Sequence, residues 1–408
     1  MRRHTTGIQR GEPGVIVAGI MSGTSADGIN VALVRVLGRG FRSRPELLAH
    51  YEFPYPANVR RAVLEAMNAP AAAVADLSRL NFLLGDLYAD AVLAAQRRTK
   101  LECALVGCHG QTLYHQGQAK PYLGRRVRCT WQTGEGAVIA AKVKVPVVSD
   151  FRPADMVAGG RGAPLVPFLD YVLFRHRRYG RIVQNIGGIG NLTAIPPKAA
   201  PEDVVAFDTG PGNMVIDAVT DHFFQRAFDR NGRIAARGKV LEPVLVKLLH
   251  HPFLRQKPPK TAGREEFGRE FVGEFLRLCR RAEGKDVVAT ATALTARSIG
   301  LAIGRYVLPL LESTTKNRKP GQRPARFREF IVSGGGARNA TLLRMLREEL
   351  ETHEIKLHTT DEFGMPSGAK EAVAFALLAY QTWCRLPSNI PSATGAARPA
   401  VLGKVSYA

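Results

Sequence analysis

The stretch from Val15 to Val36 constrains the fold of this chain most, because two apolar runs flank one short turn of small and polar residues. The pattern predicts a strand, a tight turn at Ser22–Gly28 and a second strand. Glycines in the turn permit positive φ, so its backbone N–H groups can surround a phosphate while Asp27 holds a cation. An ordinary hairpin is the alternative. The turn is not a P-loop, since it lacks Gly-Lys-Ser/Thr and a strand follows it.

The length of the chain, 408 residues, predicts two domains, and 45% hydrophobic residues are enough to fill both cores. No apolar run approaches the roughly 20 residues of a membrane span. The first fourteen residues are polar and lack the apolar centre of a signal peptide. We therefore expect a soluble, cytoplasmic protein that does not bind a membrane.

The formal net charge of +22 raises the question of nucleic acid. The basic residues are spread along the chain, with clusters at 175–181 and 316–328, and they are not interleaved with aromatic residues on one face. A solvated surface that attracts an anionic substrate is the favoured interpretation, and dedicated nucleic-acid binding is the alternative. The five cysteines are scattered and indicate neither a disulfide framework nor a zinc site. Cys108 could be a thiol nucleophile beside His109, but an apolar strand predicts a buried structural thiol.

Polar residues follow two predicted strands in the first half. The strand Ala104–Gly107 leads into Cys108-His109-Gly110-Gln111-Thr112, and the strand Val145–Val148 leads into Ser149-Asp150-Phe151-Arg152. Open α/β sheets bind their ligands beyond the carboxyl ends of strands. A surface ion pair is the alternative for Asp150 and Arg152. The glycine cluster at 158–164 is predicted to mark the passage between domains.

The second half repeats the plan of the first. A strand at Arg181–Asn185, a glycine turn at Gly187–Asn191 and a strand at Leu192–Ile195 form a second strand-turn-strand unit, which suggests an internal duplication. A further strand, Val204–Phe207, then ends on Asp208-Thr209-Gly210-Pro211-Gly212-Asn213, and a helical pattern begins directly. A glycine turn at a helix N-terminus suits phosphate oxygens. Asp208 would face the phosphoryl acceptor, and its alternative role is a helix N-cap or Asx turn.

A third glycine turn, Ser333–Asn339, joins the strand Phe330–Val332 to a helix predicted over Ala340–Glu351. Its glycines present no side chains to a flat ligand such as a nucleobase. After a strand at Ile355–His358, a helix of core residues extends to Trp383 with Glu371 in its first turn. Favourable interaction with the helix dipole is the alternative role of Glu371.

The order of the three turns matches the phosphate 1, phosphate 2 and adenosine elements of the actin, Hsp70 and sugar-kinase fold, in which ATP binds between two α/β lobes with mixed sheets flanked by helices. The motifs GIMSGTSADG, CHGQT, SDFR, GGRGAPLVP, NIGGIGNLT, FDTGPGN, PPKTAGRE, VSGGGARN and AKEAVAFALLA together resemble the 1,6-anhydro-N-acetylmuramic acid kinase family, from about Gly19 to the C-terminus. The resemblance implies an N-terminal lobe of residues 1–151 plus 369–408 and a C-terminal lobe of residues 152–368.

The resemblance also implies a reaction that uses ATP and Mg²⁺. The enzyme would open the 1,6-anhydro bridge by hydrolysis and phosphorylate O6, giving MurNAc-6-phosphate and ADP in peptidoglycan recycling. Asp208 would act as general base and Glu371 as a second carboxylate near the sugar, while Asp27 would orient Mg²⁺. The implied sugar-pocket residues are His109, Gln111, Thr112, Asp150 and Arg152. The implied ATP-binding residues are Ser22, Gly23, Thr24, Ser25, Asp27, Gly28, Gly187, Gly188, Gly210, Gly212, Asn213, Gly334, Gly335, Gly336 and Asn339.

Two residues depart from the family pattern. Arg161 stands where Gln is more frequent, and Asn30 stands where Asp is common. Two alternatives therefore stay open: a kinase of a related anhydrosugar such as levoglucosan, and an actin-like nucleotide switch. The sequence also leaves the oligomeric state open, with a homodimer as one option.

Overall fold

The computed structural model describes residues 14–23, 26–311 and 325–408. The chain divides into two compact units, unit 1 (residues 1–173 and 369–408) and unit 2 (residues 174–368). The division between residues 368 and 369 coincides with the predicted lobe boundary. The division between residues 173 and 174 falls later than the predicted boundary at 151/152.

Unit 1 is built on a mixed sheet with the strand order β12-β6-β4-β1-β2-β3, and β5 pairs with β4. The strands are β1 (Val15–Ser22), β2 (Gly28–Leu37), β3 (Arg44–Pro54), β4 (Leu105–Tyr122), β5 (Arg125–Thr133), β6 (Val147–Ser149) and β12 (Lys404–Ser406). The predicted opening hairpin is confirmed, since β1 and β2 are antiparallel with Val15 opposite Val36. Strand β4 is parallel to β1 and places CHGQT beside the end of the hairpin.

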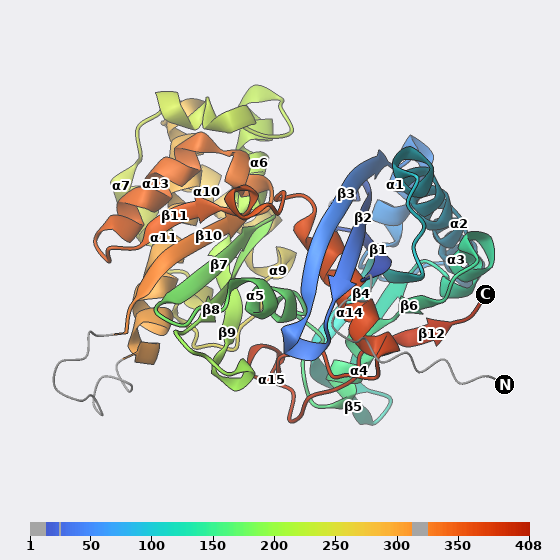
Figure 1. Cartoon of the computed structure of the whole chain (residues 1–408). Helices are drawn as coiled ribbons and strands as arrows, with labels where there is room; N and C mark the ends of the chain where they lie inside the picture. The colour runs from blue at the N-terminus through green and yellow to red at the C-terminus, as the bar shows by residue number, and fades with distance from the viewer. Residues whose placement is uncertain (1–13, 24–25, 312–324) are drawn as a thin grey trace. The chain divides into compact units, whose positions relative to one another are not determined.

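Helices cover both faces of this sheet (Figure 1). The helices of unit 1 are α1 (Ala57–Ala66), α2 (Val74–Thr99), α3 (Gly136–Val143), α4 (Phe151–Val157), α5 (Pro167–Phe174), α14 (Lys370–Trp383) and α15 (Pro391–Thr394). Helix α14 packs directly on β1 and β4 because Gly19 and Gly107 face it. A Cβ at Gly19 would lie 1.9 Å from the carbonyl oxygen of Ala372, and one at Gly107 would lie 2.3 Å from that of Phe375. Glycine is therefore required where the helix meets the sheet.

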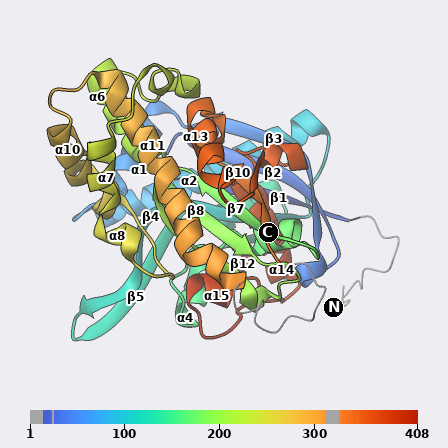
Figure 2. The same ribbon diagram turned by 90° about the vertical axis from the view of Figure 1, so that its left-hand side faces the viewer.

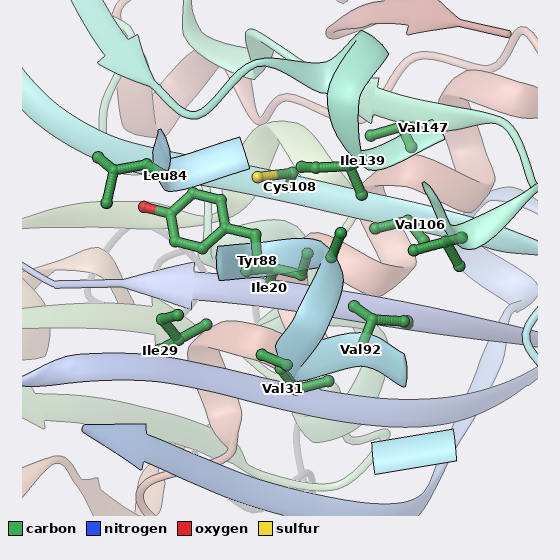
Figure 3. Packing of buried hydrophobic residues seen from close by; sticks show 14 of the residues in the cluster. Ile20, Ile29, Val31, Leu84, Tyr88, Val92, Val106, Cys108, Ile139 and Val147 are labelled. Carbon is green, nitrogen blue, oxygen red and sulfur yellow. The ribbon is translucent and has the colours of Figure 1, made fainter. Parts of the chain in front are cut away.

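The opposite face of the sheet carries the apolar core of unit 1. Side chains of a strand alternate between faces, so Ile20 and Cys108 point away from α14 and toward α2. Figure 3 shows Tyr88 of α2 among these side chains. Cys108 is fully buried, and burial raises the pKa of its thiol to about 12. The structural interpretation of this cysteine is therefore confirmed, and all five cysteines are free.

Unit 2 has a five-stranded sheet with the order β11-β10-β7-β8-β9. Its strands are β7 (Gly180–Ile186), β8 (Ile189–Ile195), β9 (Val205–Pro211), β10 (Phe327–Ser333) and β11 (Lys356–Thr359). Strands β7, β8 and β9 form an antiparallel meander. Strand β10 is parallel to β7, and β11 is parallel to β10. Unit 1 repeats this plan with β1-β2-β3 followed by β4 and β6. The topology confirms that the second half repeats the strand plan of the first, and it confirms the α/β class with mixed sheets flanked by helices.

The helices of unit 2 include α11, which runs along this unit with α6 and α7 beside it (Figure 2). They are α6 (Asn213–Phe224), α7 (Glu242–Leu249), α8 (Pro252–Arg255), α9 (Arg264–Phe267), α10 (Arg269–Leu278), α11 (Gly284–Ala302) and α13 (Ala340–Glu351). Of the part of the chain described here, one helical stretch, Gly284–Leu311, is long and apolar enough to cross a membrane. Within its apolar window, 83% of the residues are buried inside the protein.

Two predictions in unit 1 were wrong. The strand predicted to end at Gly107 continues to Tyr122, so the CHGQT residues lie within β4, because β5 pairs with its second half. The glycine cluster at 158–164 lies inside unit 1 and does not separate the domains. Asp155 of α4 explains why, since its carboxylate accepts hydrogen bonds from Gly162 N (2.8 Å), Asn389 Nδ2 (2.7 Å) and Thr394 Oγ1 (2.7 Å). These bonds fix the cluster to the C-terminal segment of the same unit.

Candidate functional site

The end of the opening hairpin is fixed to β4 by a chain of buried hydroxyl and amide groups in unit 1. Ser22 Oγ donates to Gln111 Oε1 at 2.6 Å, and Tyr55 OH donates to Ser22 Oγ at 2.9 Å. The Gln111 amide also donates to the carbonyl oxygen of Gly23 at 3.2 Å. Gln111 is fully buried, so its polar groups are committed to holding the turn. Thr24 and Ser25 lie outside the described residues.

Asp27 lies at the far end of the same turn and is exposed. Its Oδ1 lies 3.4 Å from Arg60 Nη2, and its side chain is 73% exposed. The next residue, Gly28, must be glycine because a Cβ there would lie 2.3 Å from the carbonyl oxygen of Phe53. Within the described ranges, no group of three or more His, Cys, Asp or Glu side chains could hold a metal ion. A single exposed carboxylate such as Asp27 would suit Mg²⁺, which is usually held by one or two carboxylates together with water and substrate phosphates.

Unit 1 also contains a polar cavity of about 290 Å³. Two predicted sugar-pocket residues, His109 and Asp150, line it. Thr112 does not line it but accepts a hydrogen bond from Gln132, which does, at 3.2 Å. The other lining residues are Asn81, Cys108, Gly110, Thr130, Trp131, Gln132, Gly134, Glu135, Gly136, Ser149, Pro153 and Lys404.

Most of these lining residues were not predicted, because strand β5 and the C-terminal strand β12 reach the cavity only in the folded sheet. The Gly134-Glu135-Gly136 turn was the one available signal. Glu135 caps α3 by accepting from Ala137 N at 3.1 Å, and its other oxygen accepts from Asn81 Nδ2 at 3.0 Å. Asn81 Oδ1 accepts from Gly134 N at 2.8 Å. This network holds one wall of the cavity.

His109, which lines the cavity, is held by a polar contact with Arg152 of α4. Arg152 donates to His109 Nε2 from Nη2 at 2.8 Å and from Nε at 3.2 Å. Arginine has no acceptor, so His109 Nε2 is unprotonated and its Nδ1–H donates to the carbonyl oxygen of Gly110 at 2.7 Å. Burial and the charge of Arg152 lower the pKa of His109 well below its usual value. Burial also lowers the pKa of Arg152, to about 10.

Asp150 does not pair with Arg152, and the alternative of a surface ion pair between them was wrong. Asp150 has a left-handed backbone (φ 53°), and its Oδ2 lies 2.9 Å from Lys404 Nζ. Lys404 belongs to β12, which is antiparallel to β6 and places this residue opposite Ser149. The C-terminal strand therefore supplies the cation beside Asp150.

Glu371 lies in the first turn of α14, near the same cluster. It is half-buried, and no side-chain hydrogen bond caps the helix at its N-cap residue Ala369. Burial raises the pKa of Glu371, while the charges of Lys370 and Arg152 act in the opposite direction. Phe375, one turn later, lies 4.5 Å from the His109 ring between centroids. Unit 1 thus brings His109, Arg152 and Glu371 together.

In unit 2, Asp208 lies within strand β9 and does not cap a helix. The N-cap of α6 is Gly212, so the alternative role of Asp208 as a cap was wrong. Asp208 is bound twice by the loop that follows α8. Its N–H donates to the carbonyl oxygen of Lys260 at 3.1 Å, and its Oδ2 accepts from Ala262 N at 2.8 Å. The carboxylate is therefore held in a defined position beside the glycine turn.

The two glycine turns of β7–β8 and β9–α6 pack on each other. Gly212 N donates to the carbonyl oxygen of Gly188 at 2.9 Å, and Asn213 N donates to that of Gly187 at 2.7 Å. A Cβ at Gly212 would lie 2.3 Å from the Gly187 carbonyl oxygen. Gly210 adopts φ 147°, and a Cβ there would lie 2.8 Å from Leu254. Only glycine allows these backbones to approach so closely.

The third glycine turn meets the other two at the same end of the sheet. Gly334 has φ 82°, and a Cβ there would lie 2.5 Å from Asn185 Oδ1. A Cβ at the exposed Gly335 would lie 3.2 Å from Asn213 Nδ2, while Gly336 is buried against Ile186. Asn339 caps α13 by accepting from Leu342 N at 3.0 Å. Unit 2 therefore brings the glycine turns predicted for ATP together at one end of its sheet.

Comparisons with known proteins identify the family of this chain. A family model described as anhydro-N-acetylmuramic acid kinase matches residues 15–408. A protein named anhydro-N-acetylmuramic acid kinase from Bacillus cereus (strain G9842) is 42% identical over 394 residues, covering 96% of this chain and 99% of that protein. A protein of the same name from Caldanaerobacter subterraneus is 42% identical over 398 residues, covering 96% of each.

Two solved structures share lower similarity. The activator of the 2-hydroxyisocaproyl-CoA dehydratase from Clostridium difficile with bound ADPNP is 11% identical with a TM-score of 0.41, covering 90% of this chain and 94% of that one. A ROK family glucokinase from Streptomyces griseus in complex with glucose and AMPPNP is 12% identical with a TM-score of 0.35, covering 90% and 99%.

The family model spans almost the whole described chain, and the curated relatives match over nearly their full length. The predicted class of enzyme, a sugar kinase that uses ATP, is confirmed by these matches. The chain belongs to the anhydro-N-acetylmuramic acid kinase family.

Proposed function

We propose that this enzyme hydrolyses the 1,6-anhydro bond of 1,6-anhydro-N-acetylmuramic acid and phosphorylates the freed O6, giving MurNAc-6-phosphate and ADP. The observation that carries the proposal is the placement of Asp208. Asp208 is half-buried and lies two residues before Gly210, where β9 enters the glycine turn. Its carboxylate accepts a hydrogen bond from Ala262 N. A fixed carboxylate beside a phosphate-type turn suits a base that works next to a transferring phosphoryl group.

The bond changes follow from that role. Asp208 accepts a proton from water, and the water oxygen forms a bond to the anomeric carbon C1. The C1–O6 bond breaks, O6 forms a bond to the γ-phosphorus, and the bond from that phosphorus to the β-phosphate oxygen breaks. One water and one ATP are consumed, and the proton from water stays on Asp208 until it exchanges with solvent. General base catalysis of this kind contributes roughly 10²- to 10⁴-fold to the rate.

Binding roles for ATP and the cation follow the turns already described. The exposed Gly335 leaves the backbone of the third glycine turn open to a flat adenine ring. The turns at Gly187 and Gly210 bind the phosphates. Mg²⁺, when bound, would neutralise charge on the transferring phosphate oxygens. Asp27 is the exposed carboxylate that would hold the ion in unit 1.

The sugar occupies the polar cavity of unit 1. A volume of about 290 Å³ is near the lower end of small-molecule pockets, which suits a monosaccharide. The cationic Arg152 beside His109 favours the lactyl carboxylate of the substrate, and Glu371 lies near the same cluster. We also propose that the enzyme acts in the cytoplasm, in the recycling of peptidoglycan amino sugars.

Product analysis tests the proposal. The enzyme is incubated with γ-labelled ATP, Mg²⁺ and either anhydroMurNAc or levoglucosan, in ¹⁸O-labelled water, and rapidly quenched products are analysed by mass spectrometry. We expect label transfer to anhydroMurNAc, with one ¹⁸O at C1. MurNAc kept in the same water measures spontaneous exchange at C1 and is the control. Phosphorylation of levoglucosan alone, or a phosphorylated product that keeps its anhydro ring, would refute the proposal.

A further inference from the structure

Lys260 is a buried lysine that none of the roles above employs. Its side chain is enclosed in unit 2, and the residue is 3% exposed. Three aromatic rings surround its Nζ, with centroid distances of 4.6 Å to Phe253, 5.3 Å to Tyr306 and 5.8 Å to Phe207. Nζ also donates to the carbonyl oxygen of Phe253 at 3.1 Å. A lysine is rarely buried unless it pairs with a carboxylate, so the burial of Lys260 among aromatic rings suggests that this residue has a functional role.

The same lysine belongs to the loop that holds Asp208. The Lys260 carbonyl oxygen accepts from Asp208 N, and the N–H of Ala262, two residues later, binds the Asp208 carboxylate. Phe207, which contributes one ring of the cage, is the residue before Asp208 in β9. Anchoring the lysine side chain in the cage therefore anchors the backbone on both sides of the carboxylate.

The charges around Lys260 are of both signs. Burial lowers the pKa of the Lys260 ammonium to about 8, Asp208 acts to raise it, and Arg305 of the π-helical segment η5 (Ile303–Val307) acts to lower it. The remaining titratable group of the cage is the Tyr306 phenol, whose OH donates to the carbonyl oxygen of Arg255 at 3.0 Å. Asp208 is therefore the anionic group that acts on Lys260, and its negative charge favours the protonated ammonium.

We propose that Lys260 is a positioning residue for Asp208: its caged ammonium fixes the 260–262 loop against β9 and favours the ionised form of the Asp208 carboxylate. The proposal rests on the proposed function, because it assigns a partner to the general base of that reaction. Lys260 touches neither substrate in this scheme. It acts through the carboxylate, so its loss changes the pH dependence of turnover in addition to the rate.

The test compares pH profiles of kcat/KM for the wild type, Lys260→Met and Lys260→Arg, with anhydroMurNAc and ATP as substrates. Lys257→Met is the matched control, since Lys257 lies exposed in the same loop. In Lys260→Met, we expect kcat to fall about 10- to 100-fold and the acidic limb to move up by about one pH unit, since the carboxylate loses a nearby cation. Lys257→Met should keep the wild-type profile.

Lys260→Arg provides the second readout. We expect the wild type to lose activity above about pH 8, as Lys260 deprotonates, and Lys260→Arg to keep its activity to higher pH because a guanidinium stays protonated. Circular dichroism and nucleotide binding check that each variant folds. If Lys260→Met does not fold, the alkaline limb of the Lys260→Arg profile is the test of the proposal.

The outcomes separate the two proposals. A wild type that does not convert anhydroMurNAc refutes the proposed function. A wild type that converts it, with Lys260 variants that keep both limbs of the wild-type profile, overturns the role of Lys260 and leaves the proposed function intact. A Lys260→Met variant with lower kcat and unmoved limbs also overturns it, because a purely structural loop defect would do the same.

Discussion

Arg152 makes His109 a hydrogen-bond acceptor. The guanidinium donates to Nε2 from two nitrogens, and the opposite ring nitrogen donates to a backbone carbonyl, so the imidazole is held as the neutral Nδ1–H tautomer. A proton on Nε2 would face the Arg152 cation directly. This pair therefore stays fixed over the pH range in which an ordinary histidine gains its charge.

The first prediction concerns stability at acid pH. His109 is neutral in the folded state well below its ordinary pKa of 6.5, whereas the unfolded chain takes up a proton there. Its contribution to the free energy of unfolding is complete above pH 6.5 and falls as the pH drops, by up to about 1.4 kcal/mol per pH unit. Urea unfolding at about pH 7 and about pH 5 measures this loss.

The control for this prediction is His109→Gln. The glutamine Oε1 can accept from Arg152 as Nε2 does, but it does not titrate. We expect the variant to lose less stability than the wild type between the two pH values. Equal losses in both proteins would contradict the tautomer assignment.

The second prediction concerns Asp208. Asp208→Asn should keep the fold and nucleotide binding, because an amide oxygen can still accept from Ala262 N, but should lose roughly 10²- to 10⁴-fold in kcat without a base. Steady-state kinetics and nucleotide titration measure the two effects. Asp221→Asn, at an exposed position on α6, is the control and should behave as wild type. Near-normal turnover in Asp208→Asn would remove this residue from the mechanism.

The third prediction concerns the buried ion pair between Lys370 and Asp170, which joins α14 to α5 within unit 1. Lys370 Nζ lies 2.7 Å from Asp170 Oδ1, and the side chains are only 3% and 4% exposed. Lys370→Met leaves a buried carboxylate without its cation and should destabilise unit 1 by about 3–5 kcal/mol. The double variant Lys370→Met with Asp170→Leu should recover much of this loss.

The exposed ion pair Arg35–Glu46 is the comparison for the Lys370 and Asp170 variants. Its atoms lie 3.0 Å apart, but its side chains are 39% and 56% exposed. Arg35→Met should change the free energy of unfolding by less than about 1 kcal/mol. If Lys370→Met is equally mild in urea unfolding, the buried pair does not stabilise the helix contact.

The fourth prediction concerns Asp155, which accepts three hydrogen bonds within unit 1. Asp155→Ala would leave the donors on Gly162, Asn389 and Thr394 without their acceptor, at a cost of about 3 kcal/mol or more. Urea unfolding measures the cost. Asp76→Ala is the control, because that carboxylate is exposed and forms a surface ion pair with Arg79. A similar midpoint for both variants would mean that water replaces Asp155.

Sequence patterns predicted the helices and strands whose bounds depend on residues close by in the chain. The helix Ala340–Glu351 was predicted with its observed bounds, because a glycine turn and the capping residue Asn339 precede a strong helical pattern. The opening hairpin was predicted for a similar reason. The second half of β4 was missed because it depends on β5, and the glycine cluster at 158–164 was misread because its partner Asp155 and the C-terminal segment are distant in sequence.

The residues of the candidate site fall into the same two groups: those that local sequence indicates and those that only tertiary contacts place there. His109, Asp150 and Asp208 were predicted because each lies in a polar run beside a strand. Lys404 and Trp131 reach the cavity through strand pairing, and no pattern in their own neighbourhood indicates a site. Lys260 was part of a family motif, but its burial depends on rings from α8, β9 and η5. Residues that complete a site through tertiary contacts cannot be assigned from spacing alone.

The split of unit 1 between both ends of the chain has a consequence for synthesis on the ribosome. Strand β1 is made first, but the face that carries Gly19 is covered by α14, which is made after the whole of unit 2. Domains generally fold as units during synthesis, so unit 2 can fold in the nascent chain while β1 still lacks its helix. The first strand translated is thus among the last to be completed, and the apolar surface around Gly19 stays open to solvent or chaperones until α14 leaves the ribosome.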